Sequence, residues 1–324
     1  MKIRLGYVAI SKVLGKKSTS SSTVTFSNYS KISSEEKKLE KLKTVTLSNF
    51  EALEQILKYN IKNQIHFYRI TSALIPLATH PEVGYWGHRE IFKKDFQYIG
   101  KLIKESNMRV DTHPDEFNVI NSVNSKVVEN TIVNLSRQAE WFEDMNYKDG
   151  KMVIHVGGAT GGKEESLKRF IENFNEFPKS IKERLIIEND DKTYTAKETL
   201  NLCKILNIPM VLDIHHHNCN NNDEPIVDII KDILDTWNNE NLPPKMHFSS
   251  PRDKNLIDKV DKKHSDFIDA YDFISFIETL KLFNRDVDIM LECKEKDVAL
   301  FKLVNDIRNL NQEYKWLDET TLLI

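Results

Sequence analysis

Three consecutive histidines follow a short apolar run in the stretch PMVLDIHHHNCNNND, residues 209–223. The apolar run, bounded by Pro209 and an asparagine-rich segment, is typical of a strand buried on both faces of a parallel sheet. The aspartate and imidazoles at its end are ligands that divalent metal ions prefer. A chance surface tract of histidines gives the same pattern, so the other strands must decide between the two interpretations.

Short apolar runs alternate with longer amphipathic segments along the whole chain. Eight candidate strands begin near Ile3, Ile65, Met108, Lys151, Arg184, Pro209, Lys245 and Asp286. This alternation predicts an α/β fold, a (β/α)8 TIM barrel, with residues 1–324 as a single domain; an open doubly wound sheet is the alternative. The Ser- and Thr-rich residues 11–34 are expected to form a long first βα loop over the active face.

Polar side chains stand at almost every predicted strand end, where the active site of such a barrel lies. They are Tyr7, Arg69, His113, His155, Glu188, Asp213 with His216, His247 and Glu292. One buried histidine is more often a hydrogen-bonded core residue than a ligand, but agreement among independent strands favours a metal centre. Isolated buried carboxylates are costly, and a bound cation offsets that cost.

The chain offers more ligand-type groups than one ion needs. The candidates are His80, His113, His155, Glu188, Asp213, His216, His247, His264 and Glu292. The surplus predicts two or three divalent ions, with Glu188 as a bridging carboxylate. Clustered divalent ions make hydroxide from water and stabilise the attacking and leaving oxygens of a displacement at phosphorus, so phosphodiester hydrolysis is the predicted reaction.

Composition sets looser limits on partners and location. The chain has 46 Lys and Arg against 49 Asp and Glu, a formal charge of -3, and so lacks the overall basic character of a nucleic-acid binder. Divalent ions would nevertheless make the site locally positive. Three cysteines without CxxC spacing, no leader segment and no membrane-length apolar run predict a cytoplasmic protein with no membrane partner. The sequence lacks a P-loop motif, so no nucleotide cofactor is expected, and we expect a monomer.

The motifs around these residues resemble those of the UV-damage endonucleases, a family similar in fold to endonuclease IV. In chain order they are LIPLATHP, THPDEF, IHVGGATGGK, IENDDKTYT, DIHHHN, KMHFSSP and LECKEKD. The resemblance covers most of the chain. It implies a DNA repair endonuclease that nicks damaged double-stranded DNA on the 5′ side of pyrimidine dimers and 6-4 photoproducts, with abasic sites as a further candidate lesion. We expect 3′-hydroxyl and 5′-phosphate products and no need for ATP.

The resemblance also implies the ions and their ligands. Manganese is the expected metal, with zinc, cobalt or magnesium as alternatives. One ion would be held by His113, His155 and Glu188, a second by Glu188, Asp213, His247 and Glu292, and a third by His216 and His264.

Catalysis is expected from Glu188, His216 and Lys245. Lys245 resembles a family lysine that can be carboxylated; a neutral or phosphate-contacting lysine is the alternative. His80 resembles a site histidine without an assigned role.

Lesion contact is expected from Tyr7, Arg69, Glu116 and Phe117, with packing at the barrel mouth as the alternative for Tyr7. The family often has a glutamine and an aromatic residue where this chain has Glu116 and Phe117. Phe117 can still wedge or stack, whereas Glu116 places a carboxylate near DNA phosphates. The alternatives to a nuclease are a metal-dependent sugar isomerase or epimerase on the same barrel, and a non-catalytic damage-binding protein.

Overall fold

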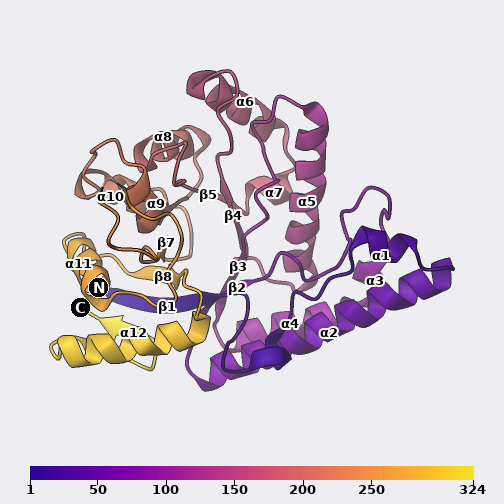
Figure 1. The fold of residues 1–324 in the computed structure, drawn as a ribbon, viewed down its shortest axis with the longest axis horizontal. Helices are drawn as coiled ribbons and strands as arrows, with labels where there is room; N and C mark the ends of the chain where they lie inside the picture. Colours follow the sequence, from indigo (N-terminus) through magenta and orange to yellow (C-terminus); the bar gives the residue numbers. More distant parts are fainter. Residues whose placement is uncertain (258) are drawn as a thin grey trace.

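Eight parallel strands close into a barrel in the computed structural model, which describes residues 1–257 and 259–324 (Figure 1). The strands are β1 (Lys2–Val8), β2 (Phe67–Ile70), β3 (Arg109–Thr112), β4 (Lys151–His155), β5 (Leu185–Glu188), β6 (Met210–Asp213), β7 (Lys245–Phe248) and β8 (Val287–Leu291). They pair in chain order, and β1 closes the sheet by pairing with both β2 and β8. The predicted (β/α)8 barrel is confirmed.

Helices cover the outside of the barrel (Figure 1). The longer ones are α2 (Glu35–Lys62), α4 (Lys93–Glu105), α5 (Ser125–Asp144), α6 (Lys163–Glu176), α8 (Ala196–Leu206), α10 (Val227–Asp235), α11 (Ala270–Lys281) and α12 (Lys296–Leu310). The short ones are η1 (Gly15–Ser18), α1 (Phe26–Ser30), α3 (His88–Ile91), α7 (Lys179–Lys182) and α9 (Ile214–Cys219). Among the described residues, no helix combines the length and the apolar character that a membrane span requires.

The connection from β1 to α2 contains η1 and α1 and is fastened to the other end of the chain. Asp297, fully buried near the start of α12, accepts hydrogen bonds from the hydroxyl of Ser11 and, at 2.7 Å, from the backbone N–H of Lys12. α2 begins where this connection ends, because the side chain of Ser34 accepts a hydrogen bond from the N–H of Lys37 and caps the helix.

A C-terminal hairpin that the sequence analysis did not predict lies beside the barrel. It consists of β9 (Lys315–Trp316) and β10 (Thr321–Leu323), and β10 pairs antiparallel with β1. The N-terminal amino group of Met1 donates to the carbonyl of Ile324 at 3.2 Å, so the two ends of the described chain are adjacent.

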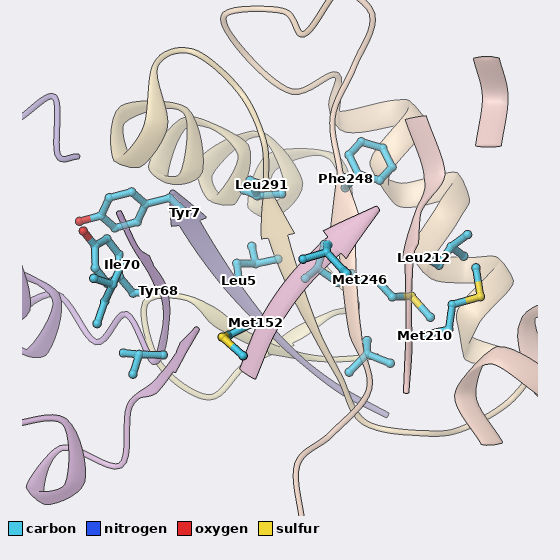
Figure 2. Close-up of a cluster of buried hydrophobic side chains, with 14 of the residues drawn as sticks. Leu5, Tyr7, Tyr68, Ile70, Met152, Met210, Leu212, Met246, Phe248 and Leu291 are labelled. Carbon is cyan, nitrogen blue, oxygen red and sulfur yellow. The ribbon is translucent and has the colours of Figure 1, made fainter. Parts of the chain in front are cut away.

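One face of each barrel strand packs against the surrounding helices and forms the main core. Figure 2 shows part of this layer, with Leu5, Tyr7, Tyr68, Ile70, Met152, Met210, Leu212, Met246, Phe248 and Leu291 labelled. Tyr7 shares this face with Ile3 and Leu5, since side chains two residues apart point the same way. Its hydroxyl donates to Oδ1 of Asn60 on α2 at 2.7 Å, and the side chain is fully buried.

The other face points into the barrel and carries charged side chains. Two ion pairs join strands that are not neighbours and therefore cross the interior. Nη1 of Arg109 on β3 lies 2.8 Å from Oδ2 of Asp288 on β8, and Nζ of Lys245 on β7 lies 2.5 Å from Oδ2 of Asp111 on β3. Arg4 on β1 donates two further hydrogen bonds to Asp288, at 2.6 and 2.7 Å.

We predict that Asp288→Asn destabilises the protein by about 3–5 kcal/mol, because it leaves the buried guanidinium group of Arg109 and the partly buried one of Arg4 without a carboxylate. Urea unfolding measures the effect. Asp286→Asn is the matched control: Asp286 pairs with Lys2 at 3.6 Å and both side chains are about half exposed, so we expect a change below about 1 kcal/mol. Equal unfolding midpoints for the two variants would show that the interior pairs contribute little.

Candidate metal centre

Four imidazoles surround the carboxylate of Glu188 at the carboxyl ends of the strands. Nδ1 of His247 lies 2.9 Å from Oε1 and Nε2 of His113 lies 3.1 Å from Oε2. Nδ1 of His216 is 3.3 Å from Oε1, and Nε2 of His155 is 3.9 Å from Oε2. Glu188 is 1% exposed, so this carboxylate depends on the histidines for its stabilisation.

Two further carboxylates, those of Asp213 and Glu292, lie beside Glu188. Nδ1 of His247 is 3.2 Å from Oε1 of Glu292 and 4.0 Å from Oδ2 of Asp213. Nη2 of Arg69, on β2, lies 2.6 Å from the same Glu292 oxygen. His247 therefore contacts both Glu188 and Glu292 through the same ring nitrogen.

The charges in this region hold the carboxyl groups ionised. Burial alone would raise the pKa of Glu188, but the nearby His247 and His155 and hydrogen bonds from His113 and His216 hold that pKa well below its usual range. Burial would likewise raise the pKa of Glu292, which Arg69 and His247 hold low. Burial disfavours the charged form of His216, but Asp213 and Glu188 outweigh it and raise the pKa of His216 to about 11.

The donor set fits divalent metal ions. Three groups bring their ligand atoms within 4.8 Å of one another: His113, His155 and Glu188; Glu188, Asp213 and His216; and Asp213, His247 and Glu292. Mixed imidazole and carboxylate donors are what zinc and manganese take in proteins. Oδ2 of Asp213 and Nδ1 of His155 are buried and have no hydrogen-bond partner among the described residues, so both are free to serve as ligands.

The structure brings together most of the residues predicted for the ions. The first predicted set, His113, His155 and Glu188, lies together as one group. His216 groups with Glu188 and Asp213, and the centroid of its ring also lies 6.2 Å from that of His264, with which it was expected to share an ion. His264 lies at the edge, with its Nδ1 4.0 Å from Oε2 of Glu292.

The three consecutive histidines lie in the short helix α9, whereas the sequence analysis placed them at the end of a strand. Asp213 is the N-cap of α9, because its Oδ1 accepts a hydrogen bond from the N–H of His216 at 2.9 Å. The helical turn directs the three rings differently. His216 reaches Glu188, His215 is buried with its ring edge-on to that of His264, and His217 is buried without a contact to the carboxylates in the groups above.

Two residues expected to touch DNA, Tyr7 and Arg69, lie inside the protein. Tyr7 is in the layer between barrel and helices, bonded to Asn60. Arg69 points into the barrel, where its Nη2 contacts Glu292 and donates to Nε2 of His247 at 2.8 Å. Burial lowers its pKa, but Glu292, Asp111 and Glu188 together raise it, so the guanidinium stays charged.

Lys245 lies one layer below the histidines, two residues before His247 on the same strand. It is fully buried and its Nζ is 2.5 Å from Oδ2 of Asp111. Burial, with Arg69 adding to it, lowers the pKa of Lys245 to about 8 even though Asp111 acts in the opposite direction.

Glu116, Phe117 and His80 border two surface hollows. Glu116 is exposed and lines a groove of about 420 Å³ together with His155, His216 and His264. Phe117, 63% exposed, lines a different hollow of about 460 Å³ together with His80. The ring of His80 stacks on that of Phe26 at 4.2 Å, and His80 belongs to none of the ligand groups found in the described residues.

Two polar residues that support the site were not predicted. Asn189 joins the ends of β5 and β6: its Nδ2 donates to the carbonyl of Asp213 at 3.0 Å and its Oδ1 accepts from the N–H of Asp213 at 2.9 Å. Asp111 pairs with Lys245. The position of Asp111, two residues before His113, carried a usable signal, because both side chains fall on one strand face. Asn189 follows the end of β5 and bonds to the backbone of Asp213, so no spacing along a strand indicated this contact.

Comparisons with known proteins identify the family of the chain. A family model described as UV-endonuclease UvdE matches residues 3–318. A UV DNA damage endonuclease of Bacillus cereus (strain B4264) is 39% identical over 308 residues, which are 95% of each chain. The crystal structure of SacUVDE superposes with a TM-score of 0.82 and 34% identity, covering 95% of this chain and 99% of the other.

A structure of L-ribulose 3-epimerase shares the barrel at a lower level. It has a TM-score of 0.52 and 14% identity and covers 83% of this chain and 84% of the other. At that identity the likeness concerns the fold alone.

We predict that Glu188→Gln loses most of the divalent metal binding of the protein, because Glu188 contributes to two of the three ligand groups. The amide keeps the size of the side chain but removes its negative charge. Mn²⁺ bound per chain is measured by equilibrium dialysis. Glu240→Gln is the control, since Glu240 pairs with Lys151 at 2.5 Å and belongs to none of the groups. Unchanged Mn²⁺ binding by Glu188→Gln would contradict the assignment.

We also predict that Lys245 titrates near pH 8 in chelator-treated protein, against about 10.4 for an ordinary lysine. Between these values the folded chain binds fewer protons than the unfolded chain, so the Lys245 contribution to stability rises with pH there and is constant below about pH 8. NMR of ¹⁵N-labelled lysine side chains measures the midpoint. A midpoint above pH 10 contradicts the proposed effect of burial.

Proposed function

The chain belongs to the UV-endonuclease UvdE family, and on that premise we propose that it is a metal-dependent enzyme that nicks DNA on the 5′ side of UV photoproducts. Family membership makes it a nuclease of UV-damaged DNA. The side of incision, the products and the need for metal are the finer parts of the proposal. The observation that carries the proposal is that two of the three adjoining ligand groups share the buried carboxylate of Glu188, while the third shares Asp213 with one of them.

The proposed ligands are those of the three groups: His113, His155, Glu188, Asp213, His216, His247 and Glu292. His264 is a further proposed ligand from the edge of the site. We propose two or three ions, manganese before zinc, cobalt or magnesium. When bound, such ions supply a nucleophile from water and neutralise the charge that develops on phosphate oxygens.

The chain's own residues hold the reacting groups in place. In the proposed hydrolysis, water adds to phosphorus and the bond to the 3′ oxygen breaks, which leaves a 3′-hydroxyl and a 5′-phosphate. Glu188 and His216 are the proposed catalytic residues, because both belong to the ligand groups and would hold the ions that act on the phosphodiester. Lys245 would contribute from the layer beneath, through its pair with Asp111.

Lesion recognition is proposed for the segment that separates the two surface hollows. Phe117 is exposed and can stack on an unstacked base, and Glu116 lines the groove next to His155 and His216. Photoproducts and abasic sites stack poorly, so extruding them from the duplex costs less than extruding intact bases. This difference selects damaged DNA without reading its sequence, and the proposed reaction uses neither ATP nor a second subunit.

The decisive experiment is incision of a labelled duplex that carries one pyrimidine dimer, in the presence of Mn²⁺. We expect a cut immediately 5′ to the dimer, no cut of undamaged duplex and no cut with a chelator. His155→Ala should reduce the incision rate at least 100-fold, because it removes a ligand. His66→Ala, which removes a histidine paired with Asp318 away from the site, should cut normally.

The other outcomes separate the alternatives. Tight binding to the irradiated duplex without a cut supports a damage-binding protein. Neither cut nor binding, together with turnover of a ketose, supports the sugar epimerase. A cut that His155→Ala leaves unaffected contradicts the proposed metal centre.

A further inference from the structure

Arg69 places a permanent positive charge in one of the three ligand groups. Its Nη2 lies 2.6 Å from Oε1 of Glu292 and 2.8 Å from Nε2 of His247, and both of these residues belong to the group with Asp213. The side chain is 11% exposed, and it comes from β2, across the barrel from His247 on β7. Since the guanidinium is charged at any pH at which the protein folds, the charge cannot be titrated away.

The hydrogen bonds of His247 show how Arg69 opposes a metal ion. A guanidinium N–H can only donate, so Nε2 of His247 accepts, and a neutral ring then carries its hydrogen on Nδ1. Nδ1 faces Oε1 of Glu188 at 2.9 Å and Oε1 of Glu292 at 3.2 Å. Ligation through Nδ1 requires the hydrogen to move to Nε2, where it meets the N–H of Arg69. The contact with Arg69 and ligation through Nδ1 therefore disfavour each other.

The positive charge of Arg69 also disfavours the binding of a metal ion to this group. A cation that binds Oε1 of Glu292 shares this oxygen with the guanidinium, and two positive charges at such close range repel each other strongly in a buried site. The group of His113, His155 and Glu188 contains no atom for which a contact with Arg69 was found in the described residues. The three groups are therefore unequal in their affinity for cations.

We propose that Arg69 is a built-in competing cation, which weakens divalent ion binding at Asp213, His247 and Glu292 and makes this group the last to be filled. The inference rests on the proposed metal-dependent function. It assigns Arg69 a role in regulating metal occupancy rather than in contacting DNA. At limiting metal, the ions bind first at His113, His155, Glu188 and His216.

The test measures Mn²⁺ affinity directly, without a nuclease assay. Chelator-treated wild type and Arg69→Met are titrated with Mn²⁺, and free Mn²⁺ is followed by electron paramagnetic resonance. We expect Arg69→Met to tighten the weakest site at least tenfold, because it removes the competing charge. Arg69→Lys keeps the charge and should bind like wild type. Arg69→Gln is a second neutral variant in case Arg69→Met does not fold, as judged by circular dichroism.

Arg109→Met is the matched control, because it also removes a buried guanidinium from the barrel interior. Arg109 pairs with Asp288, which keeps its two hydrogen bonds from Arg4. The weakest Mn²⁺ site should be unchanged in this variant. Equal tightening by Arg109→Met would show a general effect of charge and overturn the proposal.

The remaining outcomes are also informative. Weaker or unchanged binding by Arg69→Met overturns the competing role, and weaker binding would mean that Arg69 positions Glu292 and His247. Wild type that binds Mn²⁺ nowhere refutes the proposed metal-dependent function itself. That failure is distinct, since it precedes any comparison of the variants.

Discussion

The ionised, buried carboxylate of Glu188 is the constraint on which the top of the barrel depends. At 1% exposure such a charge is unstable without partners, and four imidazoles from four different parts of the chain supply them. These partners come from the ends of β3, β4 and β7 and from α9. They can converge only because the sheet closes and brings non-neighbouring strands to face one another. The electrostatic requirement and the closed topology are thus two aspects of one arrangement.

The same requirement explains where the apolar core lies. The interior of the barrel is occupied by cross-strand pairs such as Arg109 with Asp288 and Lys245 with Asp111. Most apolar burial must therefore come from the layer between strands and helices (Figure 2). Inside the barrel, small clusters such as Val8, Phe67 and Met290 separate the charged layers. In each charged layer, side chains of opposite charge meet across the barrel. These contacts fix the distances between the strands, and so hold the strand ends above them in place.

Strand positions and most of the side chains that meet at the strand ends could be predicted from the sequence, because short apolar runs ending in His, Asp or Glu are visible without a structure. Side-chain direction was harder. Tyr7 was assigned to the site, yet it has the same parity as Ile3 and Leu5 and so packs on α2. Arg69 was placed correctly at a strand end, but its partners, Glu292 and His247, come from distant strands that sequence spacing does not relate.

The histidine triplet shows a further limit. Whether His215, His216 or His217 reaches the carboxylates depends on the helical turn that Asp213 starts by capping α9, and three identical residues give no signal to choose among them. Similarly, the hairpin of β9 and β10 is too short for its pattern to be recognised, and its pairing with β1 is fixed by tertiary contact.

The barrel itself does not determine the reaction, since L-ribulose 3-epimerase shares it at 14% identity. The chemistry resides in the side chains that follow the strands. Two of the ligand groups share the carboxylate of Glu188 and therefore lie next to each other. Hydrolysis of a phosphodiester is helped by two ions at such short range, because one can stabilise the attacking oxygen and the other the leaving oxygen. The adjoining groove, bordered by Glu116, is open to the surface, so a long polymer can reach the site without being enclosed. Closely spaced ligand groups and open access together suit a nucleic-acid backbone better than a small sugar.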